Sequence, residues 1–166
     1  MTPDSYNTPM GICKVINGQL KPEHEVFIVE MGAYKKGEIK ELCDLTQPEI
    51  GILTAVGPQH LERFKSIENT AKTKYELIES LPQNGVAVFN NDNEICSGLA
   101  DKTTIKVVRY GIDKSDDRVN LTAKNIQNTS RGLIFNVEDG SGEATEFKTK
   151  LLGKNNVYNI LAATAV

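Results

Sequence analysis

The sequence lacks the features of several large classes of protein. It contains no run of about 18 apolar residues, the length a membrane-spanning helix needs, and its start, MTPDSYNTPMG, lacks the charged and apolar regions of a signal peptide. Its net charge of -3 disfavours a nucleic-acid role. The three cysteines are far apart and form no CxxC pair, a pattern typical of reduced thiols. We therefore expect a cytoplasmic protein with no membrane span and no nucleic-acid partner.

Apolar runs alternate with helical patterns in the first two thirds of the chain. With 166 residues, 39% hydrophobic and 25% charged, the chain can bury the core of one compact domain, residues 1–166. Strands of a parallel sheet are predicted at 25–32, 49–57, 85–92 and 104–111. Helices between them are predicted at 36–45, 66–81 and 93–102. This order predicts an α/β fold: a mostly parallel, doubly wound sheet with helices on both faces.

The pattern changes after Asp113. Short segments with partial alternation, separated by the turn-rich NTSRG and EDGSGEA, predict a small antiparallel β section at about 112–150. This section is either added to the edge of the sheet or packed against it. A last apolar helix begins near Asn155 and stops in mid-pattern at Val166, so we expect either a cut boundary or further chain that once followed.

Polar side chains follow the predicted strands, where ligands bind in open parallel sheets. Glu30 ends one apolar run, His60 follows the next, and Asn91 and Asp92 follow a third. A carboxylate in that position can hold a divalent cation, and a neutral imidazole can serve at one ligand position. The alternatives stay open: Glu30 as a strand-end charge, His60 as a loop hydrogen-bonder, and Asn91 and Asp92 as caps of the next helix.

Lys74 lies inside the helix predicted at 66–81. A lysine on a helix usually points into water, and the residues alone favour that interpretation. Beside a metal, however, a neutral lysine amine can take up carbon dioxide, and the resulting carbamate has two anionic oxygens. On the last helix, Asn156 and Asn159 can also be explained without a ligand, as residues near the start of the helix with Asn159 on its polar side.

Four stretches, taken together, resemble the central domain of the Mur ligases. They are VFIVEMGAYKKGEI, PEIGILTAVGPQHLERFKSIENTAKTKYELIESLP, GVAVFNNDN and LLGKNNVYNILAATAV. The Mur ligases are ATP-dependent enzymes that add amino acids or peptides to the UDP-muramoyl precursor of peptidoglycan. The patterns EMGA..KGEI and HLERF.S.E..A..K.E are most similar to the members that add D-alanyl-D-alanine to the UDP-muramoyl tripeptide. The resemblance covers nearly the whole chain and is weakest between about 112 and 148.

The resemblance implies a role for each candidate residue. Glu30 and His60 fall on magnesium-ligand positions, and Lys74 falls on a carbamylated, metal-bridging lysine. Asn156 and Asn159 fall on a segment near the adenine of ATP. Asn91 and Asp92 fall on a turn that is either structural or near the nucleotide. The implied cofactors are ATP and Mg²⁺. The implied substrates are a UDP-muramoyl peptide and D-alanyl-D-alanine, joined through an acyl phosphate.

The sequence also departs from the family. It has no G-x-x-x-x-G-K-[ST] phosphate loop, and its one Gly-Lys pair, Gly153–Lys154, is followed by Asn155, where the family usually has histidine. We therefore expect a fragment, truncated at both ends, that binds ATP weakly and ligates nothing by itself. Three other interpretations are a folylpolyglutamate- or cyanophycin-type ligase domain, the amidating lipid II ligase subunit, and a non-catalytic α/β scaffold. The EMGA and HLERF motifs disfavour the folylpolyglutamate- or cyanophycin-type domain, and the scattered cysteines disfavour the amidating lipid II ligase subunit.

Overall fold

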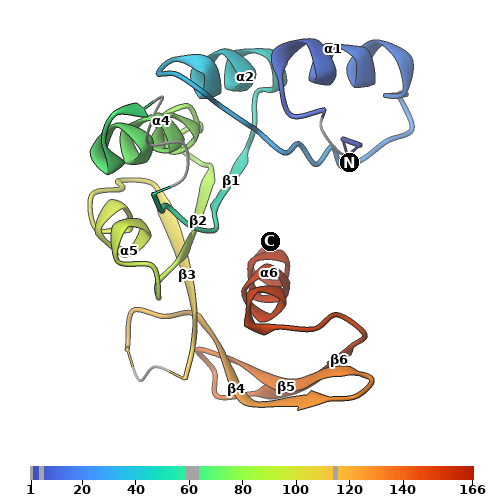
Figure 1. Ribbon diagram of the computed structural model, residues 1–166, viewed down its shortest axis with the longest axis vertical. Coiled ribbons are helices and arrows are strands. Elements are labelled where there is room, and N and C mark those ends of the chain that lie inside the picture. Colours follow the sequence, from blue (N-terminus) through green and yellow to red (C-terminus); the bar gives the residue numbers. More distant parts are fainter. Residues whose placement is uncertain (1, 4–5, 59–63, 114–115) are drawn as a thin grey trace. The chain divides into compact units, whose positions relative to one another are not determined.

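The computed structural model describes residues 2–3, 6–58, 64–113 and 116–166 (Figure 1). The chain divides into two compact units. Unit 1 consists of residues 1–48 and 57–80, and unit 2 of residues 49–56 and 81–166. No helix in the described ranges is long and apolar enough to cross a membrane.

The described residues of unit 1 include the helices α1 (Pro9–Gly18), α2 (Glu38–Thr46) and α4 (Ile67–Glu79). Their shared core consists of Ile12, Ile39, Leu42 and Cys43, against which Leu77 and other partly buried side chains pack. Helix α2 was predicted from its periodicity. Helix α4 was also predicted, together with its start: the Ser66 hydroxyl accepts the N–H of Asn69 at 3.2 Å, as an N-cap does.

Helix α1 was not predicted, although the sequence contains its signals. Thr8 is the N-cap and Pro9 takes the first turn, where a proline's missing N–H costs nothing. Ile12 and Val15 then follow at helical spacing and are buried.

The strand predicted at 25–32 is wrong, because this segment carries no strand in the structure. Two backbone hydrogen bonds tie it to the N-terminal segment, from Thr2 N to Ile28 O at 3.0 Å and from Gly32 N to Asn7 O at 2.9 Å. Val29 and Met31 pack on the helical core, whereas Ile28 is 58% exposed. Exposed and partly buried side chains thus alternate along this segment, as they do in a strand. A strand also needs a neighbouring strand to form a ladder, and none of the described strands pairs with this segment.

The described residues of unit 2 form a six-stranded sheet in the order β1-β2-β3-β4-β5-β6. Its strands are β1 (Ile50–Leu53), β2 (Val86–Asn90), β3 (Lys106–Ile112), β4 (Leu121–Thr129), β5 (Gly132–Asp139) and β6 (Ala144–Thr149). Strands β1 to β4 pair in parallel, and β4, β5 and β6 pair antiparallel. The antiparallel section is thus confirmed, and of the two arrangements left open it is the one added to the edge of the sheet.

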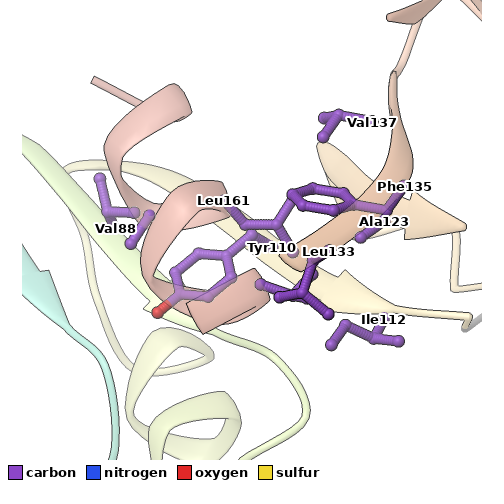
Figure 2. Packing of buried hydrophobic residues seen from close by; sticks show 10 residues of the cluster. Val88, Tyr110, Ile112, Ala123, Leu133, Phe135, Val137 and Leu161 are labelled. Carbon is purple, nitrogen blue, oxygen red and sulfur yellow. The ribbon is translucent and has the colours of Figure 1, made fainter. Parts of the chain in front are cut away.

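In the described part of unit 2, the helices α5 (Glu94–Ala100) and α6 (Lys154–Thr164) pack on the sheet. Successive residues of a strand point to opposite faces of the sheet, so neighbouring residues of β3 contact different helices. Arg109 reaches Ser97 on α5 and Asp101 at the C-cap of α5, while Tyr110 belongs to the core formed with α6. Figure 2 shows Leu161 of α6 in this core beside Tyr110 and Phe135. The predicted α/β sheet with helices on both faces is confirmed.

Candidate functional site

The residues predicted to bind metal and nucleotide fall in different units. Glu30 and Lys74 belong to unit 1, whereas Asn91, Asn156 and Asn159 belong to unit 2. His60 lies outside the described residues.

Glu30 presents an exposed carboxylate from a segment that is otherwise held in place. Its backbone N–H donates to the Thr2 hydroxyl at 3.3 Å, and its neighbours Val29 and Met31 pack on the core of unit 1. Within the described ranges, no hydrogen bond or ion pair occupies the carboxylate itself. A hard, anionic oxygen donor free to bind is what Mg²⁺ requires of a protein ligand.

Lys74 lies on a half-buried part of helix α4. Leu77, one turn further along the helix and on the same side, packs against the cluster that also receives Val29 and Met31. The side chains next to Glu30 and the side chain one turn after Lys74 therefore contribute to the same apolar cluster. This arrangement differs from that of a lysine on a fully solvated helix face.

The described residues contain no group of three His, Cys, Asp or Glu side chains able to hold a metal. A magnesium site in unit 1 therefore needs at least one ligand besides the His, Cys, Asp and Glu side chains of the described residues. The Glu30 carboxylate fits the ion by its chemistry. Lys74 fits only as a carbamate, because an ammonium group has no lone pair to donate, whereas a carbamate has two anionic oxygens.

Glu76 is a buried carboxylate that was not assigned a role from the sequence. It is 7% exposed, and it accepts the N–H of Gly37 at 2.8 Å and the N–H of Lys40 at 3.1 Å. Gly37 is the N-cap of α2, with φ of 92°, and a glycine has no side chain to cap the helix. The carboxylate that satisfies the start of α2 thus comes from α4. The signal in the sequence was the glutamate of the pattern K.E, two residues after Lys74.

In unit 2, Asn91 belongs to a buried hydrogen-bond network. Its side-chain oxygen accepts from Arg109 Nη1 and from the Ser97 hydroxyl, both at 3.1 Å, and its amide donates to Asp116 at 3.1 Å. Arg109 continues the network to Asp101 at 2.7 Å. This network ties β2 and β3 to α5. The cap of α5 is Asn93, whose side chain accepts the N–H of Cys96 at 3.0 Å, so the alternative that Asn91 or Asp92 caps this helix is wrong.

Asp92 joins three elements at the end of β2. One carboxylate oxygen accepts the N–H of Ile112 on β3 at 2.8 Å and the hydroxyl of Tyr158 on α6 at 2.9 Å. Burial, together with this hydrogen bond to Asp92, raises the pKa of Tyr158 to about 12. A Cβ at Gly111 would lie 3.1 Å from the other carboxylate oxygen, so glycine leaves space for the aspartate.

The two candidate asparagines of α6 have different environments. Asn156 lies in the first turn and donates from its side chain to the carbonyl of Leu152 at 2.8 Å. Asn159 is exposed, as expected for the polar side of the helix. An exposed amide can both donate to and accept from a ligand.

The family of this chain follows from a comparison with models of protein families. Residues 1–166 match the Mur ligase middle domain. The chain belongs to this family. The UDP-N-acetylmuramoyl-tripeptide–D-alanyl-D-alanine ligase of Escherichia coli (strain K12) is 33% identical to this Mur ligase middle domain over 168 residues, which cover 99% of the chain and 36% of the relative.

Solved structures have the same fold as this Mur ligase middle domain. A MurF ligase from Thermotoga maritima in complex with ADP matches with a TM-score of 0.82 and 26% identity, covering 98% of this chain and 36% of that one. MurF from Acinetobacter baumannii matches with a TM-score of 0.87 and 21% identity, covering 99% of this chain and 35% of that one. The chain thus spans about a third of the length of these relatives.

Proposed function

We propose that this chain is the ATP-handling middle domain of a ligase that joins D-alanyl-D-alanine to a UDP-muramoyl tripeptide through an acyl phosphate. The observation that carries the proposal is the match to the E. coli ligase of that name, which extends over 99% of the chain. The ADP complex of the T. maritima relative supports a nucleotide as ligand. The proposed substrates are ATP, a UDP-muramoyl peptide and D-alanyl-D-alanine, with Mg²⁺ as cofactor.

Glu30, His60 and Lys74 are the proposed metal ligands. Mg²⁺ held by these residues would neutralise negative charge on the phosphoryl group that is transferred. Glu30 contributes an exposed carboxylate from a segment fixed by its packed neighbours. Lys74 reacts as the neutral amine: its nitrogen forms a bond to the carbon of CO₂ and loses one proton to water, which leaves a carbamate anion. None of the three acts as a nucleophile toward the substrate.

The nucleotide contacts are assigned to unit 2. Asn159 is the more direct candidate, because its amide is exposed and free to pair with the edge of a base. Asn156 already donates to Leu152, so its proposed role combines holding the start of α6 with presenting its amide oxygen. Asn91 acts from within the buried network, by fixing the turn at the end of β2.

A chimeric enzyme tests this function. The matching third of the E. coli ligase is replaced by this chain, and phosphate release is measured with all three substrates and with each omitted. We expect release that requires all three. A chimera that folds by circular dichroism but turns over only with another amino acid in place of D-alanyl-D-alanine would support the glutamate- or aspartate-adding alternative. A folded chimera without any turnover would support the scaffold.

The same chimera tests the proposed ligands. Lys74→Met and Glu30→Gln should each lower kcat by at least about a hundredfold, because each removes an anionic metal ligand. The matched control for Lys74→Met is Lys72→Met, an exposed lysine on the same helix, which should leave kcat unchanged. Full activity of Lys74→Met would contradict the assignment.

A further inference from the structure

We propose that Glu76 is a positioning residue that fixes Lys74 relative to the segment carrying Glu30. The inference rests on the proposed function for the roles of Lys74 and Glu30. The contacts of Glu76 themselves are structural observations: two hydrogen bonds from one buried carboxylate to the backbone at the start of α2.

Glu76 replaces both halves of a capping box. In a local capping box, the N-cap side chain accepts the N–H of the third helical residue, and the side chain of that residue accepts the N–H of the N-cap. Here one carboxylate takes both: the N–H of Gly37, the N-cap, and the N–H of Lys40, the third residue of α2. The donor residues precede Glu76 by 39 and 36 positions, so the cap is a tertiary contact.

The acidic residues of α2 do not duplicate this contact. Glu38 accepts the backbone N–H groups of Tyr34 and Lys35 at 2.7 and 3.2 Å, so it holds the loop before the helix. Glu41 is exposed. Glu76 is 7% exposed, and a carboxylate at that depth is stable only with strong partners, which the N–H groups at the positive end of a helix provide.

The two hydrogen bonds of Glu76 hold the helix that carries Lys74 against the start of α2, which follows the segment that carries Glu30. Lys74 lies two residues before Glu76 on α4, and Gly37 lies seven residues after Glu30 along the chain. A rotation or slide of α4 that moved Lys74 would break both bonds of the Glu76 carboxylate. The carboxylate therefore determines which way α4 presents Lys74 to the segment leading from Glu30.

Two other roles for Glu76 are disfavoured by its geometry. Each of its carboxylate oxygens already accepts a backbone N–H, which leaves the group poorly placed to bind a metal or to accept a proton from substrate. A cap that only stabilises α2 is the remaining rival. This rival predicts a loss of stability without any change at Lys74.

The experiment measures carbamate on Lys74 in the 166-residue chain. The chain is equilibrated with ¹³C-bicarbonate and Mg²⁺, and the carbamate carbon is observed by NMR. Lys74→Met identifies the signal. Glu76→Gln keeps the size of the side chain but replaces one carboxylate oxygen with an NH₂ group. One of the two backbone N–H groups then faces a donor instead of an acceptor. Glu79→Gln, exposed on the same helix, is the matched control. All spectra are recorded where circular dichroism shows the variant folded.

We expect Glu76→Gln to lower the carbamate signal about tenfold, as the loss of one charge-assisted hydrogen bond would, and Glu79→Gln to leave it unchanged. A second measurement follows the nuclear Overhauser contacts of the Leu77 methyl groups with the cluster of Ile39 and Leu42. These should weaken in Glu76→Gln, because α4 loses its fixed position.

The outcomes separate the inference from the proposed function. If the wild-type chain forms no carbamate while Glu76→Gln loses the Leu77 contacts, the role of Lys74 is wrong and the positioning role of Glu76 stands. If Glu76→Gln is folded and keeps both the carbamate and the Leu77 contacts, Glu76 is a cap alone and the inference is overturned.

Discussion

Asp92 should be among the most important polar residues for the stability of unit 2. Its carboxylate accepts the N–H of Ile112 and the hydroxyl of Tyr158, and so ties β2 to β3 and to α6. A hydrogen bond to a charged group contributes about 1.5–3 kcal/mol. Asp92→Ala removes two such bonds and leaves a strand N–H without this acceptor, so we expect the free energy of unfolding to fall by about 3 kcal/mol. Asp92→Asn keeps one good acceptor and should cost about 2 kcal/mol.

The assay is urea unfolding followed by far-UV circular dichroism, with the slope of the transition checked for each variant. Asp117→Asn is the control, because Asp117 is exposed, and it should change the free energy by no more than about 0.5 kcal/mol. Tyr158→Phe alone should cost about 1 kcal/mol, and the cycle of Asp92→Ala with Tyr158→Phe should show a coupling energy of similar size. An Asp92→Ala variant as stable as Asp117→Asn would show that the two hydrogen bonds of Asp92 do not stabilise unit 2.

Two further predictions concern a glycine and the buried tyrosines. Gly132→Ala should destabilise the chain by about 3 kcal/mol or more, because Gly132 has φ of 133° and a Cβ there would overlap the carbonyl of Thr149. The control is Gly98→Ala, on α5 with open space around it, which should be neutral or stabilising. Equal urea midpoints for the two variants would contradict this prediction. Above pH 10, stability should fall as pH rises toward 12, because burial raises the pKa of Tyr158 and Tyr110 above their unfolded value, so that the unfolded state ionises first. Urea midpoints from pH 9 to 12 should decline less steeply in Tyr158→Phe, and an identical decline would contradict the assignment.

Local patterns were sufficient to predict most elements of the fold. The spacing of apolar residues predicted α2 and α4, Ser66 marked the start of α4, and apolar runs predicted β1 to β3 in order along the chain. The segment 25–32 shows the limit of such patterns. Its apolar run is typical of a strand, but whether a strand forms depends on a pairing partner, and the run itself carries no information about that partner. Helix α1 could have been predicted from Thr8 and Pro9, whose significance was missed.

The candidate site was predictable only in part. Glu30 and Lys74, chosen from strand-end position and family resemblance, do belong to one compact unit. The role of Glu76 could not be predicted, because its partners at Gly37 and Lys40 are 39 and 36 residues away and are backbone groups, which no side-chain motif reveals. The same holds for Asn91, whose buried partner Arg109 lies 18 residues further along the chain.

Glu30 and a carbamylated Lys74 are the proposed ligands of Mg²⁺. A crystal structure of the chimeric enzyme with Mg²⁺, bicarbonate and a non-hydrolysable ATP analogue tests this assignment most directly. We expect electron density for a carboxyl group on Lys74 Nζ, and a Glu30 oxygen about 2.0–2.1 Å from the ion. An unmodified Lys74 ammonium, with Glu30 directed away from the bound metal, would contradict it.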